Sequence, residues 1–337
     1  MLEVGLTLVI AAAGGWLASL AGLPAAWLLG ATLAVTVAGF LKLPVLVTKA
    51  VQNPALALVG LAMGSRITGD TLALVVEWPL SFLVLLLAIV VSMWLCMAYL
   101  ERVCGFDRAT SLLSSSPGGM VVVASFAAEG HGHMARILVI QSLRLLFLTA
   151  VVPLTLTTAA AADPSAEPPL TMALGVMLAL AALGFGLGLV LQRLRVPSPM
   201  LLGGLAVGGL THATDLVHGT VPDAAAAVAF LVIGSVIGAR FRRLTLADVR
   251  GLLIPSLVVT AIASVVSGSA ALAVAILLDQ PFGQVWVAYA PGGVEAMAAI
   301  ALEFDFEATY VAAHHVMRIV VISLALGFLL QWTSRRS

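Results

Sequence analysis

Two arginines inside apolar stretches have the clearest chemical potential in this sequence. Arg144 and Arg318 each lie about ten residues into a long apolar run. Ten residues of helix rise about 15 Å, which places each guanidinium near the middle of a membrane, where an isolated charge costs several kcal/mol. Each arginine therefore needs a partner, which is either backbone carbonyls, Glu295 or a substrate carboxylate gripped by two hydrogen bonds. A structural clasp and a substrate contact fit the sequence equally well.

A Pro-Gly-Gly motif precedes each arginine, at Pro117-Gly118-Gly119 and at Pro291-Gly292-Gly293. Proline ends a helix and glycine permits an unusual turn with close backbone approach. The helix that follows begins with free N–H groups and the positive end of its dipole, which favour an anion. Carbonyls that end the preceding helix favour a cation such as sodium. The motifs therefore predict two binding tips, with a plain tight turn as the alternative.

Other polar residues stand close to these motifs. Glu295 is a candidate carrier of a proton or cation, with a plain ion pair to Arg318 as the alternative. His314 lies four residues before Arg318 on one helical face, and a cavity-lining role is predicted for it and for His315. Scattered histidines without thiolate or carboxylate company predict no metal, and no cofactor is expected beyond a coupling ion, H⁺ or Na⁺. The predicted binding residues are Ser115, Ser116, Pro117, Gly118, Gly119, Gln141, Arg144, Pro291, Gly292, Gly293, Glu295, His314, His315 and Arg318.

The sequence around these residues is duplicated. The two Pro-Gly-Gly motifs are separated by 291 − 117 = 174 residues, and Arg144 and Arg318 by 318 − 144 = 174. The same spacing relates Gly60, Gly64, Arg66 and Glu129 to Gly234, Gly238, Arg240 and Glu303. We therefore expect a first transmembrane repeat at 1–157, an extracytoplasmic linker at 158–170 and a second repeat at 171–337. Duplicated halves in an apolar chain are typical of transporters.

Composition decides the broad class. Hydrophobic residues make up 61% of the chain and charged residues 9%, against about 25% charged in an ordinary soluble domain. The sequence therefore predicts a polytopic membrane protein in contact with lipid. No basic run, zinc spacing or helix-turn-helix pattern predicts nucleic-acid binding.

Apolar runs of about 20 residues predict ten membrane spans, five in each repeat. They lie near 3–21, 25–41, 50–66, 78–100 and 134–157, and near 171–191, 198–214, 224–240, 254–278 and 308–331. The segments 105–129 and 281–303 hold the Pro-Gly-Gly motifs, and each is either a crossing broken helix or a re-entrant hairpin.

Charge favours the re-entrant hairpin. With ten crossings and both termini in the cytoplasm, 13 of the 16 basic residues lie inside, as the positive-inside rule requires. If the two segments crossed instead, the cluster from Arg240 to Arg250 would face outwards. Five crossings per repeat also invert the second repeat relative to the first. The predicted fold is all-α, with about ten transmembrane helices in two inverted five-helix repeats, each with a re-entrant hairpin.

The paired motifs resemble those of the bacterial AbrB family of duplicated membrane proteins. The resemblance rests on the Pro-Gly-Gly segments, on Gln141-Ser142-Leu143-Arg144, and on Glu303-Phe304-Asp305 followed by the run from Val311 to Arg318. It covers 5–157 and 175–331. Family members have been labelled ammonia monooxygenases or regulators of gene expression, and nothing in these residues supports either label directly.

The function expected from the residues and the resemblance is secondary transport of a small solute by alternating access with proton or sodium coupling. The anion-binding features favour a small organic anion. We expect a multi-pass protein of the bacterial cytoplasmic (inner) membrane, in a homodimer by analogy. A channel, or a membrane-embedded sensor with an indirect role in gene regulation, is the alternative. A membrane enzyme is the least favoured class, and we expect no enzymatic activity.

Overall fold

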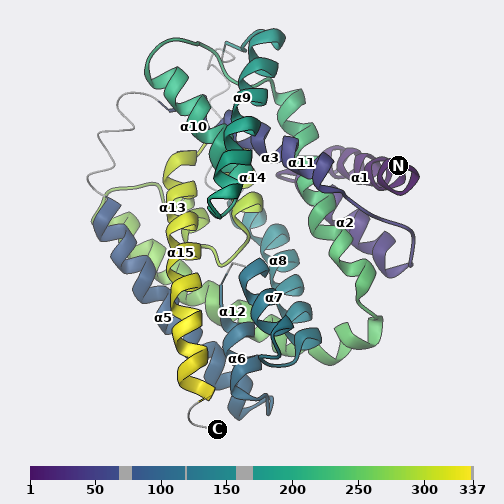
Figure 1. The fold of residues 1–337 in the computed structure, drawn as a ribbon, viewed down its shortest axis with the longest axis vertical. Helices are drawn as coiled ribbons and strands as arrows, with labels where there is room; N and C mark the ends of the chain where they lie inside the picture. Colours follow the sequence, from purple (N-terminus) through teal and green to yellow (C-terminus); the bar gives the residue numbers. More distant parts are fainter. Residues whose placement is uncertain (68–77, 118–119, 157–169, 335–337) are drawn as a thin grey trace.

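The computed structural model describes residues 1–67, 78–117, 120–156 and 170–334, with the side chains of 121, 308, 327 and 329–334 outside the description. These residues fold into helices joined by short loops (Figure 1). The first half contains α1 (Leu2–Leu20), α2 (Ala26–Phe40), α3 (Lys49–Gly64), α5 (Trp78–Arg102), α6 (Arg108–Ser115), α7 (Met120–Ala128) and α8 (Met134–Leu156). The second half contains α9 (Leu174–Arg193), α10 (Pro199–Ala213), α11 (Asp223–Ala239), the 3₁₀ turn η2 (Arg240–Arg243), α12 (Leu246–Leu277), α13 (Phe282–Tyr289), α14 (Val294–Glu303) and α15 (Ala308–Ser334).

A helix stands at each of the ten predicted spans, and most ends differ by only a few residues. The exception is α12, which begins at Leu246 instead of near 254. Thr245 and Asp248 form a capping box there, in which each side chain accepts a hydrogen bond from the other residue's backbone N–H, at 3.1 and 3.0 Å. A capping box satisfies helix N–H groups whether or not the next residues are apolar. The apolar run therefore placed this helix start too late.

Seven of these helices are long and apolar enough to cross a membrane. They are α1, α5, α8, α9, α11 with η2, α12 and α15. The other three predicted spans, α2, α3 and α10, have 15, 16 and 15 residues, which is shorter than the roughly 20 residues that cross 30 Å of hydrocarbon. The described residues thus form an all-helical polytopic membrane protein with seven helices of spanning length.

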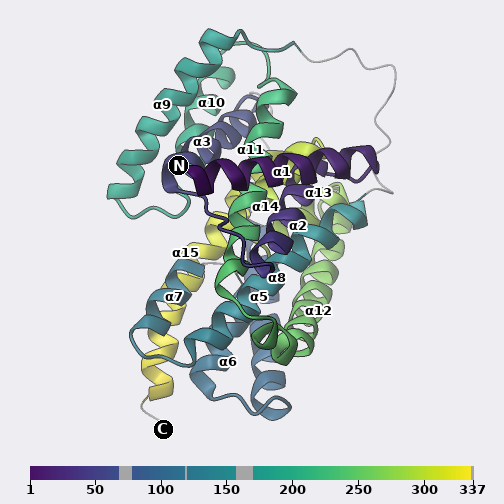
Figure 2. The ribbon, with the colours of Figure 1, turned by 90° about the vertical axis from the view of Figure 1, so that its right-hand side faces the viewer.

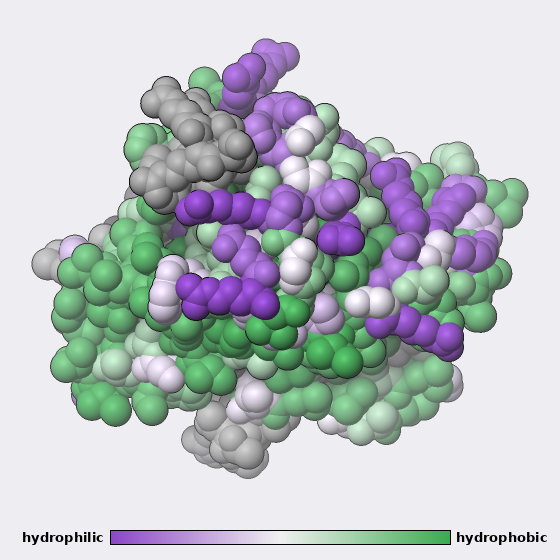
Figure 3. All heavy atoms as spheres, turned by 90° about the horizontal axis from the view of Figure 1, so that it is seen from below, coloured by the Kyte–Doolittle hydropathy of each residue, from purple (hydrophilic) through white to green (hydrophobic). Residues whose placement is uncertain are grey.

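The outer surface is apolar, as expected for contact with lipid. On α5, the side chains of Leu83, Leu87, Val90 and Trp94 are 55 to 66% exposed. At the end of the molecule seen from below, where α6 lies, hydrophilic side chains gather in one region bordered by hydrophobic ones (Figure 3). A water-facing end next to an apolar flank is the surface of a membrane protein.

Close helix packing joins the two halves of the chain. α3 packs against α10, and α11 packs against α2, as the two ribbon views also show (Figure 2). A Cβ added at Gly60 would collide with the carbonyl oxygen of Leu201, and one added at the equivalent Gly234 would collide with that of Leu28. Small residues allow such backbone contact between membrane helices. Each half therefore packs its third helix against the second helix of the other half.

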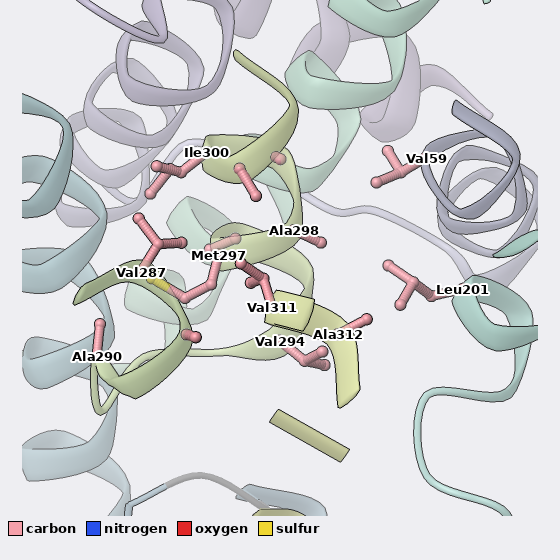
Figure 4. Packing of buried hydrophobic residues seen from close by; sticks show 14 of the residues in the cluster. Val59, Leu201, Val287, Ala290, Val294, Met297, Ala298, Ile300, Val311 and Ala312 are labelled. Carbon is pink, nitrogen blue, oxygen red and sulfur yellow. The ribbon is translucent and has the colours of Figure 1, made fainter. Parts of the chain in front are cut away.

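The core lies around α14. Eight of its ten residues, including Met297, Ala298 and Ile300, are buried, and they meet Val287, Val311 and Ala312 of the neighbouring helices (Figure 4). Each segment that holds a Pro-Gly-Gly motif consists of two short helices, α6 with α7 and α13 with α14. The second break is thus held inside the protein.

Candidate functional site

The second Pro-Gly-Gly segment is a tight turn between α13 and α14. Its Gly292 N–H donates to the Ala290 carbonyl at 2.7 Å, and Gly293 caps α14 with φ −78° and ψ 140°. Neither glycine has a positive φ, so the backbone conformation does not require glycine at either position, and a Cβ at each would meet only the ends of flexible side chains. A Cβ at Gly292 would lie 2.8 Å from the Met297 methyl carbon, and one at Gly293 would lie 3.1 Å from Leu145. In the first motif, Gly118 and Gly119 lie outside the described residues.

Arg144 binds the carbonyl groups at the end of α6. It donates to the carbonyl oxygens of Ser116 at 2.5 Å and Ser114 at 3.4 Å, and to the side-chain oxygen of Gln141. Gln141 in turn donates to the carbonyl oxygens of Leu113 at 2.9 Å and Ser116 at 3.0 Å. The last carbonyls of a helix lack partners within the helix and carry the negative end of its dipole. A cation at this point is therefore stabilised by the backbone itself.

Arg318 binds the carbonyl groups after α13 in the same way. Its guanidinium donates to the carbonyl oxygens of Ala290 at 2.6 Å and Gly292 at 2.7 Å, and to His315 Nδ1 at 2.7 Å. His315 Nε2 lies 3.0 Å from the carbonyl oxygen of Val287. Because a guanidinium only donates and a carbonyl only accepts, His315 must be neutral with its proton on Nε2.

Both arginines are thus partnered by backbone carbonyls at the helix ends, one of the three alternatives open to them. They are 2% and 1% exposed, and the described ion pairs do not include one between Arg318 and Glu295. The Nε atom of Arg318 is buried and has no hydrogen-bond partner among the described residues. The hydrogen bonds to the carbonyls and their neighbours therefore involve the Nη atoms of both guanidinium groups, and the Nε donor of Arg318 is left over.

The serines before the first motif are held within the protein. Ser115 Oγ donates to the Ser111 carbonyl of its own helix at 2.7 Å. The hydroxyl of Ser116 is buried without a partner among the described residues. Neither serine, nor Pro117, lies among the residues of the cavity described next.

His314 lies away from Arg318, in an aromatic cluster against α5. Its Nε2 is 2.8 Å from Ser81 Oγ, and its Nδ1 is 2.7 Å from the carbonyl oxygen of Tyr310. Its ring packs 4.0 Å from the ring of Tyr310 and 4.4 Å from that of Phe82, measured between centroids. The side chain is fully buried. Neither His314 nor His315 borders the cavity.

A cavity of about 700 Å³ lies beside the second tip. Seven predicted residues border it, namely Gln141, Arg144, Pro291, Gly292, Gly293, Glu295 and Arg318. Polar residues that the sequence reasoning did not assign to the site also border it, and they are Lys49, Gln52, Asn53, Gln192, Arg195, Ser198, Arg240 and Ser323.

The lining is strongly basic. Five basic residues border the cavity, Lys49, Arg144, Arg195, Arg240 and Arg318, against a single carboxylate, that of Glu295, among the lining residues that the structure describes. Such a wall raises the local concentration of anions.

Arg240 is the most informative of the residues that were missed. It ends α11 and lines both the large cavity and an adjoining pocket of about 20 Å³ that it shares with Glu295. Its Nη1 lies 3.1 Å from the Met120 sulfur. The spacing of 240 − 66 = 174 from Arg66 was the available signal, but the sequence alone placed Arg240 in a cytoplasmic basic cluster.

Arg66 has different surroundings from its equivalent Arg240. It donates to the carbonyl oxygen of Leu302 at 3.2 Å and pairs with Asp305 at the end of α14. Near that ion pair, burial raises the pKa of Glu307 to about 7. The equivalents of Leu302 and Asp305 are Ala128 and His131, since 302 − 174 = 128 and 305 − 174 = 131. Arg240 is instead next to Met120, at the other end of α7.

Comparison with known proteins places this arrangement in a family. The family model described as "Transition state regulatory protein AbrB" matches residues 27–334. The chain belongs to the AbrB family. It is 25% identical over 316 residues to the Escherichia coli (strain K12) protein named "Putative regulator AbrB", covering 90% of this chain and 88% of that one. It is 24% identical over 347 residues to "Uncharacterized protein YhjN" of Bacillus subtilis (strain 168), covering 94% and 89%.

The AbrB resemblance expected from the paired motifs is therefore confirmed. For this AbrB-family chain, the site that the described residues form is a basic cavity beside the second Pro-Gly-Gly turn. No group of three or more His, Cys, Asp or Glu side chains is placed to hold a metal ion in the described part of the chain.

Proposed function

We propose that this protein is a secondary transporter that moves a small organic anion across the bacterial cytoplasmic membrane by alternating access. The observation that carries the proposal is the cavity of about 700 Å³, which is bordered by five basic residues and one carboxylate among the residues that the structure describes. Its volume lies in the range of small-molecule sites. Its polar wall is built at a helix break, where membrane transporters place their substrate sites.

The equivalence of the two halves supports an inverted repeat. In each half, an arginine and the polar residue three positions before that arginine bind the carbonyls at a helix end. Each half also packs its third helix on the second helix of the other half. Halves related by a pseudo-twofold axis in the membrane plane produce such reciprocal contacts. In this proposal, α6 with α7 and α13 with α14 are re-entrant hairpins that enter from opposite faces.

The difference between Arg66 and Arg240 supports alternating access. Arg66 ties α3 to the end of α14, whereas Arg240 stands open to the cavity beside Met120. Equivalent halves that adopt different arrangements represent one of two conformations, and exchanging the two arrangements gives the other conformation. The predicted topology puts Lys49, Arg195 and Arg240 on the cytoplasmic side, so the structure corresponds in this proposal to the inward-open state.

The experiment has two stages. A thermal-shift screen of purified protein against organic anions, organic cations, neutral metabolites and ammonium finds the ligand class, since a ligand at 100 times its Kd stabilises the native state by about 2.7 kcal/mol. Uptake of the best ligand into proteoliposomes, with and without a proton or sodium gradient, then tests transport. Asn53→Trp fills the cavity wall and should block uptake, while Ala50→Trp, an exposed residue on the same helix that does not border the cavity, should not.

The competing functions give different results. A channel shows flux that does not saturate and does not respond to a gradient of the coupling ion. A sensor binds ligand without flux, a reading favoured only by the word "regulator" in the name of one relative and by the description of the family model as a regulatory protein. Stabilisation by cations or metals alone contradicts the proposed substrate class.

A further inference from the structure

The wall of the large cavity has an apolar part as well as a basic part. The apolar part comes from α3, α7, α8, α14 and α15. Its residues include Leu56, Met120, Val122, Leu145, Val294, Ile319, Val320 and Leu324. A small, fully hydrated anion would leave these side chains in contact with water, whereas an anion with an apolar body covers them. The lining therefore bears on the kind of anion that the cavity takes.

The apolar part continues onto the outer surface of α15. Val320 and Leu324 border the cavity and are 38% and 73% exposed, and Phe328 follows one turn later. Leu324 belongs to the apolar window Thr309–Leu326 of this helix, six residues or about 9 Å beyond Arg318. Exposed apolar side chains on a spanning helix at this depth face the hydrocarbon of the membrane. The cavity therefore has one edge in contact with lipid.

The cations of the wall differ in whether they already have a partner. The arginines at the two Pro-Gly-Gly segments bind backbone carbonyls. Arg240 shares a small pocket with Glu295, whose negative charge stabilises it. Lys49 and Arg195 are exposed at the cavity edge, and their side chains have no hydrogen-bond or ion-pair partner among the described residues. These two cations are the ones free to bind an anion.

Arg195 also stands in a backbone conformation that favours glycine. Its φ is +59°, and Gly22, which precedes Pro24 by two residues as Arg195 precedes Pro197, has φ +65°. An arginine loses at this position the conformational ease that glycine has. Lys42 has a similar φ of +60°, but its ammonium donates to two backbone carbonyls. Arg195 makes no such bonds within the described chain, so contacts inside the protein do not explain its side chain.

Resting on the proposed function, we propose that the transported anion is amphipathic, a carboxylate that carries an alkyl or aryl body. Arg195 and Lys49 bind the carboxylate, which a guanidinium holds through two parallel hydrogen bonds. The apolar wall at Val320 and Leu324 contacts the body of the anion. Because this wall reaches the lipid, an anion dissolved in the membrane enters the cavity along α15.

The test measures binding of acetate, butyrate, hexanoate and octanoate by thermal shift, with the protein in phosphatidylcholine nanodiscs and with sodium chloride of equal ionic strength as the reference. For wild type, the apparent affinity should rise by up to about fourfold for each added methylene, the factor that corresponds to about 0.8 kcal/mol per buried CH₂. Octanol and octylammonium keep the tail and change the head group. Neither should stabilise the protein as octanoate does.

Two substitutions separate the head-group site from the apolar wall. Arg195→Gly should weaken binding of butyrate and octanoate alike, by roughly tenfold or more for a lost charged hydrogen bond. Its melting temperature without ligand should stay close to that of wild type, because the turn after α1 already uses glycine. Arg195→Lys should retain part of the affinity. Leu324→Ala should weaken binding of octanoate and leave that of butyrate unchanged.

Matched controls change the same residue types away from the cavity. Arg193→Gln alters an exposed arginine at the end of α9, and Leu87→Ala alters a leucine of α5 that is 58% exposed. Neither residue borders the cavity. Both variants should bind the whole series as wild type does.

The outcomes separate this inference from the proposed function. If no carboxylate of any length stabilises the wild type, or if octylammonium stabilises it as well as octanoate, both are overturned. If acetate binds as tightly as octanoate, anion transport stands and the amphipathic substrate is wrong. If Arg195→Gly binds as well as Arg193→Gln, the carboxylate is bound elsewhere. If Leu324→Ala keeps the chain-length dependence of wild type, that dependence comes from partitioning into lipid, and the contact with α15 is wrong.

Two other occupants of the lipid-facing edge give results of their own. If phosphatidylglycerol added to the nanodiscs abolishes the shift with octanoate, the site holds a phospholipid rather than a transported carboxylate. If Leu324→Cys, in a protein with Cys96 and Cys104 replaced, forms a disulfide-linked dimer, a second copy of the chain covers this edge. Either result overturns the proposal.

Discussion

Gln141 and His315 occupy equivalent positions and make equivalent bonds with different chemistry. Each accepts a hydrogen bond from the arginine three residues later and lies within hydrogen-bond distance of the carbonyl 28 residues earlier, at Leu113 or Val287. An amide provides an acceptor and a donor at its end, and a neutral imidazole provides the same pair across its ring. The equivalence is chemical, and it can be tested by exchange.

His315→Gln should preserve the folded protein, because the other half already uses glutamine for this purpose. His315→Leu should lower the free energy of unfolding by several kcal/mol, since it leaves the Val287 carbonyl and one Arg318 donor buried without partners, at about 1–3 kcal/mol each. Thermal unfolding in detergent without ligand measures both. Equal losses in the two variants would show that ring shape, rather than hydrogen bonding, matters at this position.

Arg318→Ala should destabilise the protein even when no ligand is present. The substitution removes the donor to two buried carbonyls, at Ala290 and Gly292, and two unmet acceptors at about 1–3 kcal/mol each put the loss at several kcal/mol. Arg144→Ala should behave alike at the first tip. An unchanged melting temperature without ligand, together with lost anion binding, would instead assign the arginines to the substrate.

Gly60→Ala should destabilise the contact between α3 and α10. The new methyl group would meet the backbone of Leu201, which cannot move without shifting the helix, and overpacking of this kind costs about 1–3 kcal/mol. Gly186→Ala is the matched control, because nothing lies within 4 Å of a Cβ at that helical position. Its melting temperature should stay the same or rise slightly, since alanine favours helix. Similar losses in both variants would argue against the close contact.

Glu307 should make stability depend on pH. Burial raises its pKa from 4.5 to about 7, and its Oε1 is buried without a partner among the described residues. Between pH 4.5 and 7 the unfolded chain releases this proton while the folded chain retains it, so stability falls as pH rises and the loss is complete above pH 7.

Glu307→Gln should remove this dependence and melt above wild type at pH 8, but close to it at pH 4. Melting temperatures measured across this range provide the test. Glu129→Gln, at an exposed position after α7, should follow the wild-type curve. If the melting temperature of the wild type rises between pH 4.5 and 7 in parallel with that of Glu307→Gln, the raised pKa is not that of Glu307.

Arg66→Ala should favour the outward-open conformation over the inward-open one that we propose for this structure. It removes the bonds to Leu302 and Asp305 that tie α3 to the end of α14. The cavity residue Gln52 has Ala226 as its equivalent, since 52 + 174 = 226. In a protein with Cys96 and Cys104 replaced, Ala226→Cys should react faster with an impermeant maleimide added outside when Arg66 is alanine. Asp305→Asn, which keeps an acceptor, should have a smaller effect, and unchanged reactivity in Arg66→Ala would argue against this contact as a gate.

The sequence by itself determined the class of protein, the duplication and the approximate position of each helix. These are local or periodic properties, because an apolar run of sufficient length must become a helix wherever it lies in lipid. It also placed two charges in apolar runs, which required partners, and it identified seven of the residues around the cavity. The AbrB family membership followed from the same paired motifs.

Only the tertiary structure decided which partners those charges have. Whether Arg318 meets a carbonyl, Glu295 or a ligand depends on how α15 packs against α13, and helical spacing contains no such information. His314 shares a helix with Arg318 but packs against α5, while Arg240 reaches the cavity from an apparent surface cluster. Contacts between halves 174 residues apart are fixed by the glycine surfaces of α3, α10, α2 and α11, because packing is a property of two surfaces together and not of either segment alone.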